Sequence, residues 1–275
     1  MRKISNSKDL IAGLYNRVAS TYGQVGPRIF ERFGNRLVEL AELHQGLPVL
    51  DVASGRGASL FAAAQSIQPQ SFAIGIDLAA AMLTETASEA TRMGIENIHL
   101  MQMDGENLAF RSNTFQAVLC GFAIFFFQDP QKAIDEWYRV LAPARTVGIC
   151  LAGRGDERWR WYEELLLVYH HRYQFCLSPV NSGVDKPEAI AELLLKAGFV
   201  EIRAVHEEYE FAYSDKEEWW RSKWTHGARF PLEQMSEDLL SKFKADVFAR
   251  LRSHQESHGL QEKWNAIYIL GNKQS

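Results

Sequence analysis

The apolar positions of the first 153 residues follow two different periods. Residues 8–44 carry apolar side chains at helical spacing, interrupted between Gly23 and Pro27, and predict two amphipathic helices. Short buried strands then alternate with helical segments, which predicts right-handed crossovers and a parallel, doubly wound, Rossmann-like α/β sheet. The expected strands are 48–53, 71–78, 97–104, 115–127 and 146–152, and the expected helices between them are 58–67, 79–94 and 129–143, the last stopped by Pro143.

After residue 153 the pattern is less regular. An aromatic helical segment covers 158–175, a helix, turn and strand cover 188–211, and a closing strand covers 264–273. The long segment before the closing strand contains EEWWRSKWTHGARF, and an insertion of this size in a compact sheet is expected to cover a site. We therefore expect one domain over 1–275, with an N-terminal helical lid at 1–44, a ligand-binding core at 45–153, and cap insertions at 154–186 and 213–262.

Composition narrows the class of protein. With 275 residues, 47% of them hydrophobic, the chain can bury a sizeable core, and its net charge of −4 argues against a nucleic-acid partner. We expect no membrane insertion and a cytoplasmic protein, because no apolar run is long enough for a span and the first residues lack a signal-peptide core. Cys120, Cys150 and Cys176 lack CxxC spacing and are expected to be buried thiols. No metal is expected, because no HxxxH, CxxC or HxE cluster occurs.

The stretch VLDVASGRG, residues 49–57, places Asp51 before a glycine turn between the first strand and the first following helix. A dinucleotide-binding turn reads GxGxxG, but Leu60 stands at the third glycine. A carboxylate here would repel a pyrophosphate and would suit a ligand that carries an ammonium group. A positively charged nucleoside therefore fits better than a dinucleotide.

These segments resemble the motifs of the class I S-adenosylmethionine-dependent methyltransferases, most closely the small-molecule group that includes the quinone C-methyltransferases. VLDVASGRG looks like the first motif, with Ala53 where many members have glycine. GIDLAAAML, MQMDGENLAF and GFAIFFFQDP followed by EWYRVLAP resemble the later motifs, so the likeness covers roughly residues 12–152. It implies S-adenosylmethionine as cofactor and a seven-stranded sheet whose last strand, around 266–270, runs antiparallel.

The resemblance also implies roles for individual acids. Asp77 would accept both ribose hydroxyls, although it would also serve as a helix N-cap. Asp104 would approach the adenine amine, although MDGEN is equally an ordinary turn. Apolar neighbours of these acids would pack on the cofactor or belong to the plain core. The expected cofactor-binding residues are Asp51, Ala53, Ser54, Gly55, Gly57, Asp77, Leu78, Met82, Met103, Asp104, Gly105 and Phe122.

The acceptor side is less defined. Phe125–Phe127 indicate an apolar or aromatic acceptor, or serve only to pack the fourth strand. Methyl transfer needs positioning and exclusion of water, and a general base is optional. We predict His226 and Tyr22 as catalytic residues, and the competing interpretation of His226 is an anchor for the neighbouring tryptophans. The other base candidates in the expected cover are Tyr15, Tyr169, His170, His171 and Tyr173.

The function expected from the sequence is S-adenosylmethionine-dependent transfer of a methyl group to a small aromatic or apolar acceptor, by C- or O-methylation. The expected partner is this small-molecule acceptor, and homo-oligomerisation is left open. Three alternatives also remain open at this point. They are a cyclisation or rearrangement assisted by bound S-adenosylmethionine without methyl transfer, a noncatalytic sulfonium-binding module, and a nicotinamide-dependent oxidoreductase.

Overall fold

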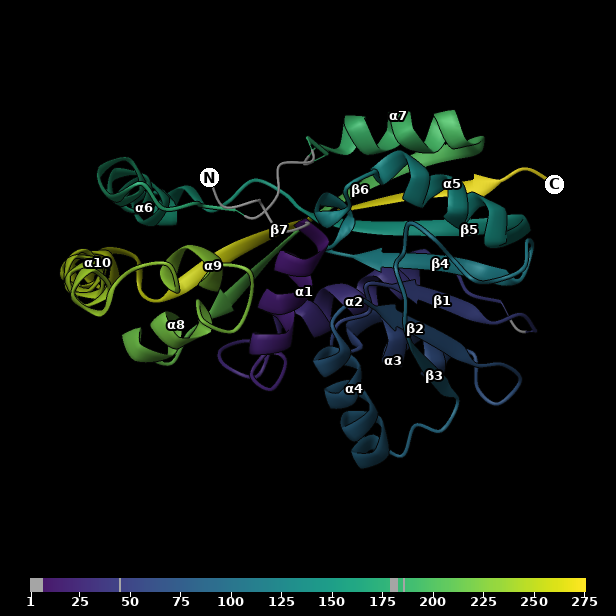
Figure 1. The fold of residues 1–275 in the computed structure, drawn as a ribbon, viewed down its shortest axis with the longest axis horizontal. Helices are drawn as coiled ribbons and strands as arrows, with labels where there is room; N and C mark the ends of the chain where they lie inside the picture. The colour runs from purple at the N-terminus through teal and green to yellow at the C-terminus, as the bar shows by residue number, and fades with distance from the viewer. Residues whose placement is uncertain (1–6, 45, 179–182, 185) are drawn as a thin grey trace.

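A seven-stranded sheet in the order β3-β2-β1-β4-β5-β7-β6 forms the centre of the molecule (Figure 1). The computed structural model describes residues 7–275 apart from 45, 179–182 and 185, so small parts of the expected lid, core and cap lie outside the described residues. The strands are β1 Val49–Val52, β2 Ala73–Asp77, β3 Ile98–Gln102, β4 Phe115–Gly121, β5 Leu141–Ala152, β6 Phe199–Ala212 and β7 Gln261–Lys273.

The strand directions agree with the sequence-based expectation. The pairs β1–β2, β2–β3, β1–β4 and β4–β5 are parallel, whereas β7 is antiparallel to both β5 and β6. The predicted seven-stranded sheet with a reversed last strand is therefore confirmed. Because the carboxyl ends of β1, β2 and β4 meet at one edge, residues that follow these strands come together there.

Helices cover both faces of this sheet. On one face, α2 and α3 bury Phe33, Leu37 and Leu60 against the strands, and on the other, α5 and α7 bury Trp137 and Leu194. The helices outside the cap are α1 Ser7–Val18, α2 Ile29–Leu40, α3 Ala58–Ser66, α4 Ala80–Met93, α5 Pro130–Val140 and α7 Pro187–Ala197, with a 3-10 turn η1 at Ile124–Phe126. The short contact between α2 and α3 requires a glycine, because a Cβ on Gly34 would lie 2.5 Å from the Ala58 carbonyl carbon.

Two predicted boundaries are wrong. The expected strand 115–127 ends at Gly121, because Phe122 adopts φ +53° and turns the chain into η1. Gly121 was the one local sign of this turn, and the apolar residues on both sides of it favoured a continuous strand. Helix α5 ends at Val140, and Pro143 lies inside β5, next to an irregularity in the β4–β5 register that tolerates a residue without an N–H donor.

The cap extends from the tip of the long β6–β7 hairpin. These strands remain paired as far as Ala212 and Gln261, beyond the rest of the sheet, and the cap helices gather at this end (Figure 1). Trp159, Trp219 and Phe243 form the centre of its separate hydrophobic core. Helix α1 lies between the cap and the sheet in Figure 1. The cap elements are η2 Glu157–Trp159, α6 Arg160–Tyr173, α8 Lys216–Ser222, α9 Arg229–Leu232 and α10 Glu237–His258.

Two further expectations can be compared with the structure. Among the described residues, no helix is long and apolar enough to cross a membrane. Cys120 and Cys150 are buried thiols, as expected, whereas Cys176 is exposed, because it lies in the loop after α6 rather than in a strand.

Candidate functional site

The turn after β1 has an unusual backbone. Ala53, Gly55 and Gly57 adopt φ values of +54°, +51° and +83°, a region that L-residues other than glycine rarely occupy. The turn is tied to α4, since the Thr86 hydroxyl donates to the Gly55 carbonyl at 2.8 Å. A Cβ on Gly57 would lie 2.9 Å from the Phe61 ring, whereas one on Gly55 would meet nothing within 4 Å. Gly57 therefore serves the packing of the turn, and Gly55 borders open space.

Asp77 ends β2 directly beside this turn. Its Oδ2 accepts from the Gly55 N–H at 2.9 Å, and its Oδ1 accepts from the Ala79 N–H at 2.8 Å. Burial raises the pKa of this carboxyl against the opposing effect of the backbone donors. Each oxygen keeps a further lone pair, so a carboxylate fixed in this way can still accept two ligand hydroxyls.

Asp51 lies deeper than the sequence indicated. Its side chain is fully buried, its Oδ2 accepts from the Ser59 hydroxyl at 2.9 Å, and its Oδ1 has no hydrogen-bond partner among the described residues. Burial, and then the negative charge of Asp77, raise the pKa of Asp51 to about 7. Asp51 lines neither of the cavities described below and lies behind the turn.

A network of charged side chains occupies the end of β3. The Lys8 ammonium of α1 lies 2.7 Å from Asp104 Oδ2 and 2.7 Å from Glu106 Oε2. Burial acts to raise the pKa of Asp104, but the hydrogen bond from Lys8 and those from Glu106 N–H and Asn107 hold it below its ordinary value. Sequence reasoning missed Lys8 and Glu106. Glu106 is signalled only by its place in the third motif, and no local pattern signals Lys8.

Two neighbouring cavities open at the carboxyl ends of the strands. We call the one that Asp77 and Asp104 line the inner cavity, with a volume of about 90 Å³, and the one that Ser54 and Arg28 line the outer cavity, with about 550 Å³. Tyr22 and Phe122 line both. Of the expected cofactor residues, those lining the inner cavity are Ala53, Gly55, Asp77, Leu78, Met82, Met103, Asp104, Gly105 and Phe122.

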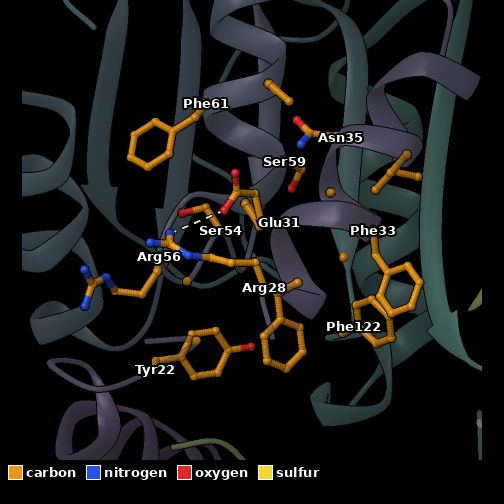
Figure 2. A pocket seen from close by; sticks show the side chains of 18 of the residues that line it. Tyr22, Arg28, Glu31, Phe33, Asn35, Ser54, Arg56, Ser59, Phe61 and Phe122 are labelled. Carbon is orange, nitrogen blue, oxygen red and sulfur yellow. Dashed lines mark hydrogen bonds and ion pairs between the residues drawn. The ribbon is translucent and has the colours of Figure 1, made fainter. Parts of the chain in front are cut away.

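The outer cavity has an aromatic wall and a polar floor and rim. Figure 2 shows Tyr22, Phe33 and Phe122 on the aromatic side, with Ser54 and the Arg28–Glu31 ion pair opposite them. The Ser54 hydroxyl is buried and has no hydrogen-bond partner among the described residues. A polar group of a ligand in this cavity would satisfy the Ser54 hydroxyl, whereas the unpaired Asp51 Oδ1 lies outside both cavities.

The two predicted catalytic residues both contact Phe30. The Tyr22 ring stacks on Phe30 with ring centres 4.9 Å apart, and His226 meets the same ring at 6.4 Å. Tyr22 lines both cavities, but His226 lines neither. Burial, followed by the charge of Asp77, raises the pKa of Tyr22, so the hydroxyl stays protonated near neutral pH.

His226 is a weaker base than its residue type implied. Its Nδ1 accepts from the Ala228 N–H at 3.3 Å, and burial, then the nearby charge of Lys223, lower its pKa to about 3. An imidazole with this pKa is neutral near pH 7, and its role as a base stays a prediction. The competing anchor role fits the contact with Phe30, although Trp219 and Trp220 belong to the separate cap core.

The remaining base candidates lie in two different parts of the molecule, the inner cavity and the cap. Tyr15 lines the inner cavity and contacts Phe126. Tyr169 lies in the cap core, where its hydroxyl donates to Asp246, and His170 bonds the Phe175 carbonyl. His171 and Tyr173 share this helix. Of Phe125–Phe127, the last two line the inner cavity and all three pack on the core, so packing accounts for the triplet and its link to the acceptor stays a prediction.

Comparisons with known proteins agree with this geometry. The profile of a family described as a methyltransferase domain matches residues 49–144. Nocamycin O-methyltransferase from Saccharothrix syringae is 27% identical over 272 residues, which cover 94% of this chain and 96% of that protein. Aklanonic acid methyltransferase DauC from a Streptomyces species is 36% identical over 137 residues, which cover 50% of this chain and 62% of that protein.

The fold also matches solved structures. The crystal structure of YcgJ from Bacillus subtilis superimposes with a TM-score of 0.58 at 20% identity, covering 89% of this chain and 99% of that one. At this identity the likeness concerns the fold alone. Strand order, the glycine turn after β1, the acid that ends β2, and the family match over these same elements lead to one conclusion. The chain belongs to the class I S-adenosylmethionine-dependent methyltransferases.

Proposed function

We propose that this protein transfers the methyl group of S-adenosylmethionine to an ionised oxygen of a small, ring-bearing acid. The observation that carries the proposal is the shared wall of the two cavities. Tyr22 and Phe122 border the inner cavity, which holds the ribose- and adenine-type acids, and also the outer cavity with its aromatic side. A cofactor in the first and an acceptor at the aromatic side of the second would meet at this wall.

The residues present fit the cofactor that the family implies. Asp77 is held by two backbone donors and would accept the ribose hydroxyls, while Met82, Leu78 and Met103 would pack on the nucleoside. The otherwise unpaired Ser54 hydroxyl, which lines the outer cavity, would donate to the carboxylate of the methionine part, and the buried Asp51 carboxyl would favour the positive charge of that part from behind the turn without contact. When bound, the cofactor supplies an electrophilic methyl group on a positively charged sulfur.

The titratable groups near the shared wall indicate in which protonation state the acceptor must arrive. The phenols of Tyr15 and Tyr22 have raised pKa values because of burial, and His226 has a pKa of about 3 and stands outside both cavities. The Asp51 carboxyl, with a pKa of about 7, is fully buried behind the turn. None of these groups is both placed and poised to remove a proton at neutral pH, so the acceptor should arrive ionised.

A carboxylate meets this requirement, since its ordinary pKa lies near 4. In the transfer, the bond between sulfur and the methyl carbon breaks and its electron pair stays on sulfur, while a carboxylate oxygen forms the new bond to the methyl carbon. The cation and the anion neutralise each other, and no proton moves. Arg28 would supply positive charge at the outer cavity, because its ion pair with Glu31 at 3.3 Å is solvent-exposed and therefore weak.

The full-length relative supports oxygen over carbon, because it is named an O-methyltransferase and spans nearly the whole of this chain. The second relative is named for a substrate that is an acid. The expected C-methylation is thus the less favoured alternative for this chain. The aromatic faces of Tyr22, Phe30 and Phe122 favour a flat ring system as the remainder of the acceptor.

The test uses purified protein, methyl-labelled S-adenosylmethionine, and a panel of polycyclic aromatic acids paired with their primary amides. We expect labelled methyl esters, one S-adenosylhomocysteine for each ester, no product from the amides, and a rate that is flat between about pH 6 and 9. Label on carbon or nitrogen would contradict the proposed acceptor atom. Cofactor binding with no transfer to any acceptor, but with rearrangement of one, would favour the cyclisation alternative.

A further inference from the structure

The ammonium group of Lys8 connects the lid helix α1 to the acids of the inner cavity. Its side chain is only 17% exposed and reaches Asp104 Oδ2 and Glu106 Oε2, both at 2.7 Å. Ile11 and Tyr15, on the same helix, line this cavity as well. Lys8 thus fastens the first turn of α1 to the acids of the cavity, while Arg17 and Asn16 fasten the other end of the helix to Glu233 and to the Ala81 N–H.

The two carboxylates paired with Lys8 are not equivalent. The Glu106 side chain is 5% exposed, and its Oε1 accepts from the Gln128 N–H at 2.8 Å, which ties it to the loop before α5. The Asp104 side chain is 24% exposed, and its Oδ2 is shared between Lys8 and the Asn107 amide. Glu106 is therefore a fixed part of the fold, whereas Asp104 can exchange partners with a ligand.

The inner cavity is smaller than a nucleoside requires. Its volume is about 90 Å³, whereas pockets that enclose a ligand of cofactor size measure at least ~300 Å³. The wall that can withdraw is α1, since the opposite side consists of β-strand ends and the hydrogen-bonded turn at Gly55. Entry of a nucleoside therefore requires α1 to move outward, which stretches the ion pairs of Lys8.

We propose that Lys8 is a positioning residue that couples closure of α1 to occupation of the adenine end of the cofactor site. In the cofactor-free protein the ammonium holds α1 closed through both Asp104 and Glu106. When the adenine amine takes Asp104, Lys8 remains on Glu106 and α1 closes over the bound nucleoside with one ion pair in place of two. The proposal rests on the proposed role of Asp104 as the adenine contact.

The test compares Lys8→Met with a matched control, Lys132→Met. Lys132 is exposed, carries the same charge beside the same acidic turn, and donates to the side-chain oxygen Oδ1 of Asn107 rather than to Asp104 or Glu106. Hydrogen exchange of residues 7–18 is measured without cofactor. Cofactor association and dissociation are followed by stopped-flow fluorescence over a range of NaCl concentrations, and a melting curve of each variant checks folding.

For Lys8→Met we expect about tenfold faster amide exchange in α1 and about tenfold faster cofactor association, with a smaller increase in dissociation, as suits the loss of partly buried charge-assisted bonds. Added salt should accelerate association in the wild type relative to Lys8→Met, and Lys8→Arg should restore the wild-type rates. Lys132→Met should behave as the wild type in every measurement.

Unchanged α1 exchange in Lys8→Met, or equal association rates in Lys8→Met and Lys132→Met, would overturn the coupling. The exchange measurement needs no cofactor and so reports on the ion pairs alone. If the wild type bound no S-adenosylmethionine, the proposed function would fail and the coupling with it, whereas a failure of the coupling alone would leave cofactor binding intact.

Discussion

The turn after β1 and the helical cover above it are built from different kinds of contact. At the turn, backbone groups hold the functional side chains, as when Gly55 and Ala79 donate to Asp77. In the cover, side chains hold side chains, as in the Tyr22–Phe30 stack and the ion pairs of Lys8. Backbone donors fix a carboxylate almost independently of its neighbours, whereas a side-chain cluster can be rebuilt residue by residue. The first region therefore suits a cofactor common to a family, and the second suits an acceptor particular to one protein.

The largest effect is expected at Asp77. Asp77→Ala removes a carboxylate that would accept both ribose hydroxyls, and it should weaken S-adenosylmethionine binding by about 2 to 4 kcal/mol, or roughly 30- to 1000-fold. Titration calorimetry measures the affinity, and Asp77→Asn serves as the control that keeps the shape. An affinity equal to that of the wild type would remove Asp77 from the cofactor site and would contradict the assignment of the turn after β1 to the cofactor.

The two glycines of the turn should respond differently. A side chain on Gly57 would collide with Phe61 and Thr86 at positive φ, so Gly57→Val should lower the free energy of unfolding by about 3 kcal/mol. Gly55→Ala has free space but also positive φ, so it should cost about 1 kcal/mol of stability and lower cofactor affinity more than expected from that loss. Urea unfolding and calorimetry separate the two. Equal stability losses would contradict the division of roles between these glycines.

Asp51 should make stability depend on pH. Its pKa is raised from an ordinary value of 3.8 to about 7 by burial and by Asp77, so the native state binds more protons than the unfolded state between these values. The contribution of this group to stability is therefore present at low pH and is lost as the pH rises toward 7. Asp51→Asn imitates the neutral form, and its stability relative to the wild type should increase by about 2 to 3 kcal/mol between pH 5 and 8. Denaturant unfolding at both pH values tests this, and a constant difference would mean that Asp51 is ionised in the native state near pH 5.

The smallest effect is expected at His226. With a pKa of about 3 it is already neutral throughout the range of a normal assay, so His226→Ala should leave the pH profile of turnover between 6 and 8 unchanged. Loss of the contact with Phe30 and of the bond from the Ala228 N–H should lower stability by about 1 kcal/mol. Tyr22→Phe is the companion variant on the other side of Phe30. It should alter the acceptor Michaelis constant more than cofactor affinity, because Tyr22 belongs to the wall at which the acceptor would meet the methyl group. A limb of the wild-type profile near pH 7 that disappears in His226→Ala would restore the histidine as a base.

The sequence by itself determined the sheet, its parallel core and reversed last strand, and the positions of Asp77, Gly55 and Asp104 at the strand ends. This information is local in the sequence. It lies in the alternation of strand and helix periods and in motifs that stand within about 55 residues of each other. The residue types did not reveal how deeply each motif residue is buried. Asp51 and Gly57 belong to the recognised motif but line neither cavity. Asp51 is fully buried, and Gly57 packs against Phe61 of α3 and Thr86 of α4.

Only the tertiary structure decided the cover. Lys8 meets Asp104 across 96 positions of sequence, and Phe30 of α2 contacts both Tyr22 and His226. The burial that lowers the pKa of His226 depends on how α1, α2 and α9 pack above the sheet, which no local pattern encodes. Hydrophobic periodicity reports which face of an element is buried but not which distant side chain shares that burial. For this reason most of the expected cofactor residues line one cavity, whereas the expected acceptor residues are distributed over the cavities and the cap.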